Sequence, residues 1–383
     1  MTSHERVVAA LNHRESDRIP FDLGGTMVSG ININALRELR AYLGLTEPAI
    51  VKDTITQMAH TGQDLVDLLK VDVKNVGPQT PPVSHLKDLG KTEGYHYLED
   101  EWGMQWRMPL NGGLYYDLFR SPLAHVETIQ DVEKYSWPNA LNPYRYENLK
   151  NEADQIVFGE KKAYVLGRMS SGMWEHAMWM TGYEKFMMDM YMNPGVIQAI
   201  MEKILEVKMQ YWERALDAVG KNVLVASCAD DLGTQTGLLI GLDMYKEQIW
   251  PYHKRLFEFI KKKAKSDIKI FFHNDGAIME TIPLLIEAGV DILNPFQVNC
   301  TGMDTKEFKR LYGKDITIWG GSCDTQHVLP YGTVQEVKDE TKRRIDDLAP
   351  GGGFIFAPIH VIQNGVPPEN IMAWWETLNQ YGN

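Results

Sequence analysis

Cysteine is scarce in this chain, and long apolar runs are absent from it. The 383 residues include only three cysteines, at positions 228, 300 and 323, too few for a disulfide framework. No stretch approaches the ~20 consecutive apolar residues that a membrane-spanning helix requires. The first turns of the chain are mixed polar and lack the apolar centre of a signal peptide. We therefore expect a cytoplasmic protein with reduced thiols and no membrane contact.

Concentrated positive charge is also missing. The formal net charge is −12, and the one basic run, residues 261–265, follows an apolar helical pattern. Lysines in the last turn of a helix interact favourably with its dipole, so this run indicates a solvated helix end. A nucleic-acid partner would need a basic surface patch, and we expect none.

Short apolar segments rich in Val, Ile and Phe recur along the chain, and helical patterns separate most of them. Such segments, bounded by turn residues, predict buried parallel strands. There are eight, at residues 19–23, 71–76, 163–166, 222–226, 269–272, 290–293, 316–319 and 353–356. Strand and helix alternating about eight times predict an α/β fold of the (β/α)8 TIM-barrel type. A doubly wound sheet is less favoured, because no glycine-rich phosphate-binding fingerprint follows the first strand.

Residues 93–122 break this alternation. Aromatic and methionine side chains such as Tyr95, Tyr97 and Trp106 alternate there with polar ones, which predicts an inserted β-hairpin or meander. No linker or low-complexity tract divides the chain. We therefore predict one domain over residues 1–383, a barrel with a small β insertion near its mouth.

Polar residues with metal-binding side chains follow several predicted strands, and in such barrels the carboxyl ends of the strands form the site. His273 and Asp275 come directly after one strand and leave the same face of an extended chain, because they are two residues apart. A catalytic zinc takes three protein ligands and keeps one open position. His273 and Asp275 are the first two candidate ligands, and Cys323 and His360 compete for the third.

Two consecutive carboxylates, Asp230 and Asp231, follow another strand. Crowding of like charges raises the pKa of one of them, which would make a general acid or base. Alternatively, they cap the helix that follows. The strand end Arg168-Met169-Ser170-Ser171-Gly172 opens a stretch rich in Met and Trp, up to residue 192, which forms either a helix core or a soft apolar wall for a flat ligand or a partner.

Several motifs are shared with one group of enzymes. They are Arg6-Val7, Asp17-Arg18-Ile19-Pro20, Asp230-Asp231-Leu232-Gly233-Thr234-Gln235, Trp250-Pro251-Tyr252-His253, His273-Asn274-Asp275-Gly276, Gly320-Gly321-Ser322-Cys323-Asp324-Thr325-Gln326 and Pro367-Pro368-Glu369-Asn370. With these motifs, over nearly its whole length, the chain resembles the uroporphyrinogen decarboxylase superfamily, and more closely its corrinoid-dependent methyltransferase branch. The resemblance implies a (β/α)8 barrel with the active site at the barrel mouth.

Two departures from the family pattern carry information. The resemblance implies an arginine-rich stretch after the first strand in true decarboxylases, where this chain has Asp22-Leu23-Gly24-Gly25-Thr26, so a porphyrinogen with many carboxylates would be repelled. It also implies His-x-Cys and a later Cys in the thiol methyltransferases, where this chain has Asp275 and His360. Carboxylate and imidazole in place of thiolates make a harder zinc site, which suits an ether oxygen.

We therefore expect an O-demethylase component that moves a methyl group from a methyl ether, an aromatic one such as a methoxyphenol, to Co(I) of a corrinoid (cobalamin). The corrinoid-binding motif Asp-x-His-x-x-Gly is absent, so a separate carrier protein is expected to bring the corrinoid. Zinc or a carboxylic acid activates the ether oxygen. The expected catalytic residues are Asp230, Asp231, His273 and Asp275, and the expected substrate contacts are Asp22, Met169, Trp174, Glu175 and Gln235.

Other functions stay open. They are methyl transfer from a methylcorrinoid to a thiol or a pterin, decarboxylation of a non-porphyrin carboxylate, and a non-catalytic role for the same barrel. The cluster of acids and histidines at the strand ends counts against the last of these, because a binding module needs no such cluster. A site that has lost its metal also stays open, and so does a homodimer.

Overall fold

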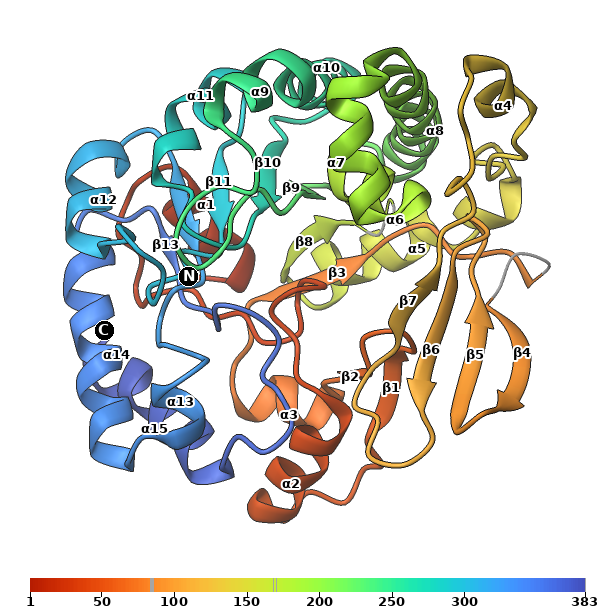
Figure 1. The fold of residues 1–383 in the computed structure, drawn as a ribbon. Coiled ribbons are helices and arrows are strands. Elements are labelled where there is room, and N and C mark those ends of the chain that lie inside the picture. Colours follow the sequence, from red (N-terminus) through yellow and green to blue (C-terminus); the bar gives the residue numbers. More distant parts are fainter. Residues whose placement is uncertain (83–85, 168, 170, 383) are drawn as a thin grey trace.

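A curled, fully parallel sheet forms the centre of the computed structural model, which describes residues 1–82, 86–167, 169 and 171–382 (Figure 1). Its strand order is β13-β12-β11-β10-β9-β8-β3. In chain order the strands are β3 (Val73–Val76), β8 (Ala163–Leu166), β9 (Val225–Ala229), β10 (Lys269–His273), β11 (Ile292–Asn294), β12 (Thr317–Trp319) and β13 (Phe354–Ile355).

Residues 20–22 close this sheet into a barrel. The amide of Asp22 donates to the carbonyl of Phe356 at 2.9 Å, and the amide of Phe356 donates to the carbonyl of Pro20 at 2.9 Å. On the other side, the amide of Asp72 donates to the carbonyl of Phe21 at 2.8 Å. The predicted first strand is thus a short bridge between β13 and β3, and the predicted (β/α)8 architecture is confirmed.

Alternation along the strands divides their side chains between two packed layers. Phe271 of β10 lies in the barrel interior, whereas Ile270 and Phe272 belong to the layer between the strands and the helices. Helix α1 (Ser3–Leu11) covers the amino-terminal end of the barrel, because its Val7, Ala10 and Leu11 belong to the interior cluster. The amino-terminal end of the barrel is therefore covered, which leaves the carboxyl-terminal end as the place where a ligand is expected.

Helices surround the barrel (Figure 1). The pattern of α14 (Val334–Leu348) is typical: Thr333 and Glu336 form a capping box at its start, and Val337, Ile345 and Leu348 form its buried face. Helix α2 (Ile33–Leu43) likewise buries one face, formed by Ile33, Leu36, Leu39 and Arg40. The others are α3 (Gln63–Leu68), α4 (Ile129–Lys134), α5 (Leu149–Asp154), α6 (Trp174–Thr181), α7 (Tyr183–Met192), α8 (Pro194–Val219), α9 (Leu242–Met244), α10 (Trp250–Lys263), α11 (Ile282–Ala288), α12 (Thr305–Tyr312), α13 (Val328–Tyr331) and α15 (Pro368–Tyr381).

An antiparallel sheet follows the carboxyl end of β3, where the sequence predicts a β insertion near the mouth. Its strands, in the order β4-β5-β6-β7, are β4 (Lys87–Thr92), β5 (Tyr95–Glu99), β6 (Gln105–Pro109) and β7 (Asp117–Arg120). Leu98 and Trp106 bury its inner face. A second hairpin, β1 (Ile50–Asp53) with β2 (Met58–His60), was not predicted.

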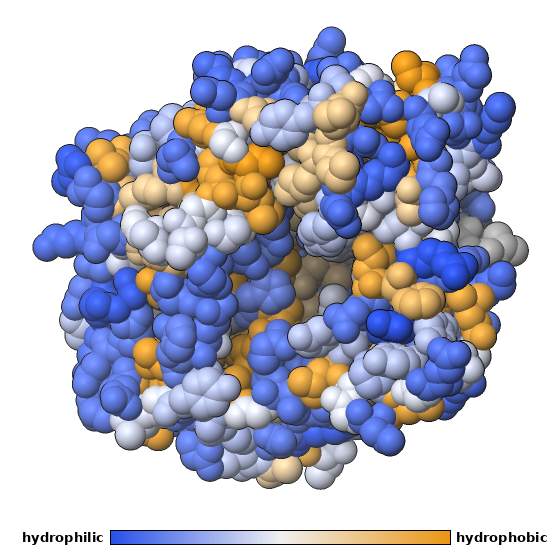
Figure 2. Space-filling view, in the orientation of Figure 1, coloured by the Kyte–Doolittle hydropathy of each residue, from blue (hydrophilic) through white to orange (hydrophobic). Residues whose placement is uncertain are grey.

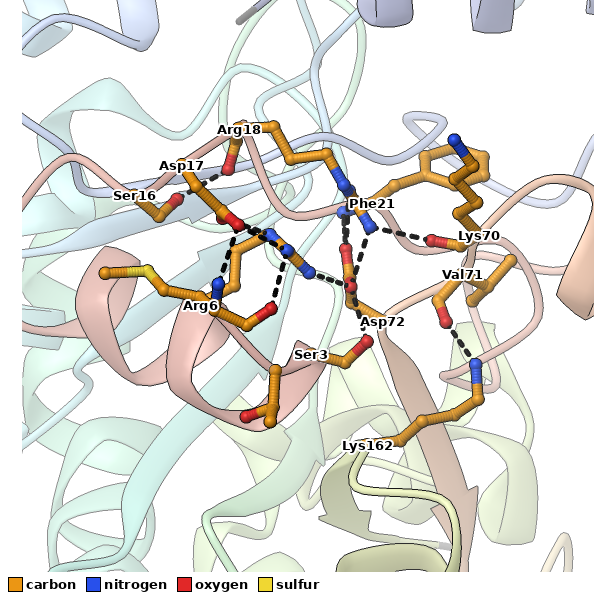
Figure 3. A network of polar contacts seen from close by, with 12 residues as sticks. Ser3, Arg6, Ser16, Asp17, Arg18, Phe21, Lys70, Val71, Asp72 and Lys162 are labelled. Atoms are coloured by element: carbon orange, nitrogen blue, oxygen red, sulfur yellow. Dashed lines mark hydrogen bonds and ion pairs between the residues drawn. The ribbon is translucent and has the colours of Figure 1, made fainter.

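A buried carboxylate holds the amino-terminal end of the barrel together (Figure 3). Asp72, which precedes β3 and is fully buried, accepts hydrogen bonds from Arg6 at 2.7 Å, Ser3 at 2.7 Å, Arg18 at 2.9 Å and the amide of Phe21 at 2.9 Å. The first motifs of the family resemblance thus lie at the end of the barrel that contributes stability rather than chemistry.

No helix in the described part of the chain combines the length and the apolar character that crossing a lipid bilayer demands.

Candidate active site

His273 ends β10 and points one ring nitrogen at the barrel mouth. Its Nδ1 lies 2.6 Å from Oδ1 of Asn294, the residue beside it in register on β11. The amide nitrogen of Asn294 donates to the carbonyl of Trp319 at 2.6 Å, so the Asn294 oxygen is left to accept from the imidazole. The proton of His273 is therefore held on Nδ1, and Nε2 presents its lone pair, as a metal-ligating histidine requires.

Asp275 and His360 complete a compact group of donor atoms. Oδ2 of Asp275 lies 3.8 Å from Nε2 of His273 and 4.0 Å from Nε2 of His360. One ligand atom from each of the three residues lies within 4.8 Å of the others. Oδ1 of Asp275 is buried and has no hydrogen-bond partner among the described residues. A carboxylate with one oxygen near two imidazole nitrogens and its other oxygen buried without a partner fits a divalent cation of the zinc type.

Asp231 borders this group of donors. Its Oδ1 accepts from the amide of Asp275 at 2.9 Å and lies 3.9 Å from Nε2 of His273. Burial raises the pKa of Asp231, and the charge of Asp275 raises it further, while His273 opposes both effects. Asp231 is therefore placed to hold a proton next to the candidate ligands.

Two glycines bring the ends of β9 and β10 together. Gly276 has φ +101°, and a Cβ there would lie 2.4 Å from the carbonyl carbon of Gly233. A Cβ on Gly233 would lie 2.7 Å from the carbonyl oxygen of Asp275. Only glycine permits this approach of the two backbones, and the approach sets Asp231 beside Asp275.

Asp230 faces the other way, although it is adjacent in sequence. This fully buried carboxylate accepts from the amides of Met173, Trp174 and Glu175 at 2.8 to 2.9 Å, and it lies 2.7 Å from Nε2 of His253. These amides start α6, so the carboxylate satisfies donors that a helix leaves unpaired. Asp230 therefore caps a helix that precedes it in the chain, not the following helix that the sequence predicts, and its oxygens are engaged away from His273.

Two other expected site residues lie apart from the donor group. Cys323 is fully buried, its thiol donates to the carbonyl of Asp324 at 3.9 Å, and burial raises its pKa. Of the two alternatives for the third ligand, His360 is the one with a ring nitrogen in the donor group. Asp22 is fully buried and accepts from Gly25, Ser29 and Trp319 at 2.6 to 2.8 Å, so it closes its own loop and has no free oxygen for a substrate.

The remaining expected substrate contacts differ in burial and in hydrogen-bond partners. Met169 and Trp174 are buried, and the indole of Trp174 donates to the carbonyl of Asp231 at 2.9 Å. Glu175 is half-buried, and burial together with the Asp231 charge raises its pKa to about 8. Gln235 is exposed and accepts from the Cys300 thiol at 3.2 Å. Positions 168 and 170 lie outside the described residues.

Sequence reasoning missed Asn294 as a functional residue. The available signal was its place at the end of the strand next to β10, in register with His273. Side chains that orient a ligand rather than bind it carry no pattern of their own in the sequence. The molecular face in this view has a hollow near its centre, and apolar residues lie along part of its rim (Figure 2).

A family model described as uroporphyrinogen decarboxylase (URO-D) matches residues 115–381. The uroporphyrinogen decarboxylase of Geobacter sulfurreducens is 25% identical over 284 residues, which cover 70% of this chain and 75% of that protein. The enzyme of the same description from Salmonella agona is 23% identical over 282 residues, with 70% and 73% covered.

One solved structure superposes over the whole chain. It is described as a methyltransferase from Methanosarcina mazei, with a TM-score of 0.68, 16% identity and coverage of 100% of this chain and 99% of that one. At this identity the likeness concerns the fold, and it agrees with the barrel built from the strands above.

Proposed function

Because this chain belongs to the uroporphyrinogen decarboxylase family, a family of enzymes, we propose that it is the methyltransferase component of an O-demethylase, which moves a methyl group from a methyl ether to a corrinoid on a separate carrier protein. The observation that carries the proposal is the group formed by His273, Asp275 and His360 at the barrel mouth. These nitrogen and oxygen donors suit a hard Lewis acid and a substrate oxygen better than they suit a thiolate.

The three residues His273, Asp275 and His360 would hold the metal. Zinc bound there would supply Lewis-acid chemistry toward the ether oxygen. Asn294 keeps the His273 ring oriented and its proton on Nδ1, so Nε2 stays available. Asp275 would contribute a carboxylate oxygen, and its negative charge would offset that of a cation.

Asp231 supplies the proton that the reaction needs. When the O–CH3 bond breaks, the electron pair stays on oxygen, and the resulting alkoxide or phenolate is a poor leaving group unless its charge is neutralised. The raised pKa of Asp231 favours a carboxyl that still carries its proton beside His273. Transfer of that proton to the departing oxygen leaves a carboxylate, and solvent at the open mouth reprotonates it.

Decarboxylation of a porphyrinogen has less support. The loop after the first strand, residues 22–30, carries no arginine, and Asp22 turns inward to bind the loop itself. Nothing in this loop matches the anion-binding role that the family resemblance assigns to it in the decarboxylases.

The test measures both metal and reaction. Purified protein is analysed for zinc by mass spectrometry, then incubated with 2-methoxyphenol and chemically reduced cobalamin, and catechol release is followed by chromatography. About one zinc per chain and catechol release that depends on cobalamin support the proposal. Release of carbon dioxide from a carboxylate substrate, or methylation of a thiol by methylcobalamin without catechol release, would replace it with one of the alternatives.

A further inference from the structure

A stripe of accessible side chains runs from the end of β8 along α6 to α7. Its members recur at every fourth position: Ser171, Glu175, Trp179, Tyr183 and Met187. Within α6, Glu175 and Trp179 are the two residues that are not buried. Because a spacing of four places residues on one helix face, α6 exposes this single face and buries all the others.

The stripe changes chemistry along its length. At its inner end the Ser171 hydroxyl donates to the Glu175 carboxylate. Farther out the indole of Trp179 donates to the Tyr183 hydroxyl at 3.2 Å, and Tyr183 is 53% exposed. Trp106 of the insertion sheet packs edge-on against Trp179, with ring centroids 5.5 Å apart. The polar end of the stripe is therefore followed by an aromatic surface, formed by Trp179 and Tyr183, that Trp106 supports from the side.

The inner end of the stripe lies beside the candidate active site. The Trp174 indole ties the first turn of α6 to the carbonyl of Asp231 at 2.9 Å. The pKa of Tyr183 is raised by burial and also by the charges of Glu175 and Asp231, which agrees with a phenol that faces the same space. A ligand whose oxygen lies near Asp231 would extend along this stripe toward Tyr183.

We propose that the stripe is the subsite for an aromatic ring of the methyl donor, with Tyr183 and Trp179 as the residues that select arenes over aliphatic ethers. This rests on the proposed function and narrows its substrate class. Aromatic rings attract each other through their quadrupoles in edge-to-face or offset contacts, which an aliphatic chain cannot make. The polar end at Ser171 and Glu175 suits a second oxygen substituent on the ring.

The experiment compares the binding of 2-methoxyphenol and of 2-methoxyethanol by calorimetry or ligand NMR, without any corrinoid. Tyr183→Ala is expected to weaken binding of 2-methoxyphenol about three- to tenfold, because one aromatic contact is lost. Tyr183→Phe keeps the ring and should bind like the parent. Tyr42→Ala is the matched control, since Tyr42 lies on α2, outside the stripe, and is 53% exposed, as Tyr183 is. Binding of 2-methoxyethanol should be the same in all four proteins.

Three results would overturn the subsite: no binding of 2-methoxyphenol to the parent, equal binding to Tyr183→Ala and the parent, or an equal loss of both ligands in Tyr183→Ala. The outcome is separable from that of the proposed function. Arene binding that depends on Tyr183 without any methyl transfer would contradict the function and keep the subsite. Methyl transfer without preference for the arene would do the reverse.

Discussion

Removal of the Asp72 carboxylate should destabilise the barrel far more than any change at the exposed partner of the same arginine. Asp72 is fully buried and accepts from two guanidinium groups, Arg6 at 2.7 Å and Arg18 at 2.8 Å. Asp72→Ala leaves Arg6, whose side chain is 8% exposed, with one carboxylate fewer and the amide of Phe21 unpaired. Breaking a buried ion pair on one side is expected to lower the free energy of unfolding by about 3–5 kcal/mol.

Asp17→Ala is the matched control. Asp17 also pairs with Arg6, at 2.7 Å, but its side chain is 43% exposed. Water screens this pair, so the loss should be about 1 kcal/mol or less. Urea unfolding followed by circular dichroism gives both values, and zinc content should stay at the parent level because the network lies at the opposite end of the barrel. If Asp72→Ala unfolds at the same urea concentration as Asp17→Ala, burial does not determine how much this carboxylate contributes to the free energy of unfolding.

Three further predictions concern the mouth and the first loop. Asp275→Ala should lower the rate of demethylation by about 100-fold or more. Asp275→Cys should retain zinc and still demethylate more slowly than the parent, because a thiolate binds zinc well but feeds electron density into it. An Asp275→Cys variant as fast as the parent would show that ligand hardness does not select the substrate. Cys323→Ser should keep the full zinc content in the same metal analysis, since the thiol is buried away from His273, and loss of zinc would restore it as a ligand. Burial raises the pKa of Asp22 to about 6. Between about pH 4 and pH 6 the folded state therefore keeps a proton on Asp22 that the unfolded state releases. The stabilisation from this proton is complete below about pH 4 and is lost as pH rises through about 6. Asp22→Asn should remove this slope from the free energy of unfolding measured in urea between pH 4 and pH 7, and an unchanged slope would contradict the assignment.

The sequence was sufficient for the barrel because burial on both faces leaves a clear pattern. Strands such as β8 and β10 are continuous apolar runs, and their bounds fall within a residue of those predicted. The insertion begins earlier than predicted, at Lys87, because β4 (Lys87–Thr92) is almost wholly exposed and has no apolar alternation. The hairpin from Ile50 to His60 was not predicted for a similar reason, since half of the residues of β1 are exposed and both strands of the hairpin are short.

The candidate site was less accessible to sequence reasoning. A strand end identifies which residues reach the mouth, but the direction of each side chain beyond the last ladder bond is set by contacts between loops. Asp230 and Asp231 are neighbours in sequence, yet one caps α6 and the other faces His273. Cys323 has a side chain that can bind zinc, but its thiol is buried away from the donor group. The stripe through Glu175 and Trp179 had a visible spacing of four, but only burial of the other faces of α6 makes that spacing informative.

The glycine contact between the ends of β9 and β10 fixes the position of the ligand residue independently of its side-chain type. Gly233 and Gly276 let the two backbones approach, and the amide of Ala277 donates to the carbonyl of Thr234 at 2.8 Å, so the Cα of residue 275 keeps its place without help from its own side chain. A thiolate, an imidazole or a carboxylate introduced there meets the same neighbours from the same origin. One backbone frame can therefore host donor sets of different softness, and a change of reaction class within such a barrel requires the exchange of a few side chains rather than a new loop.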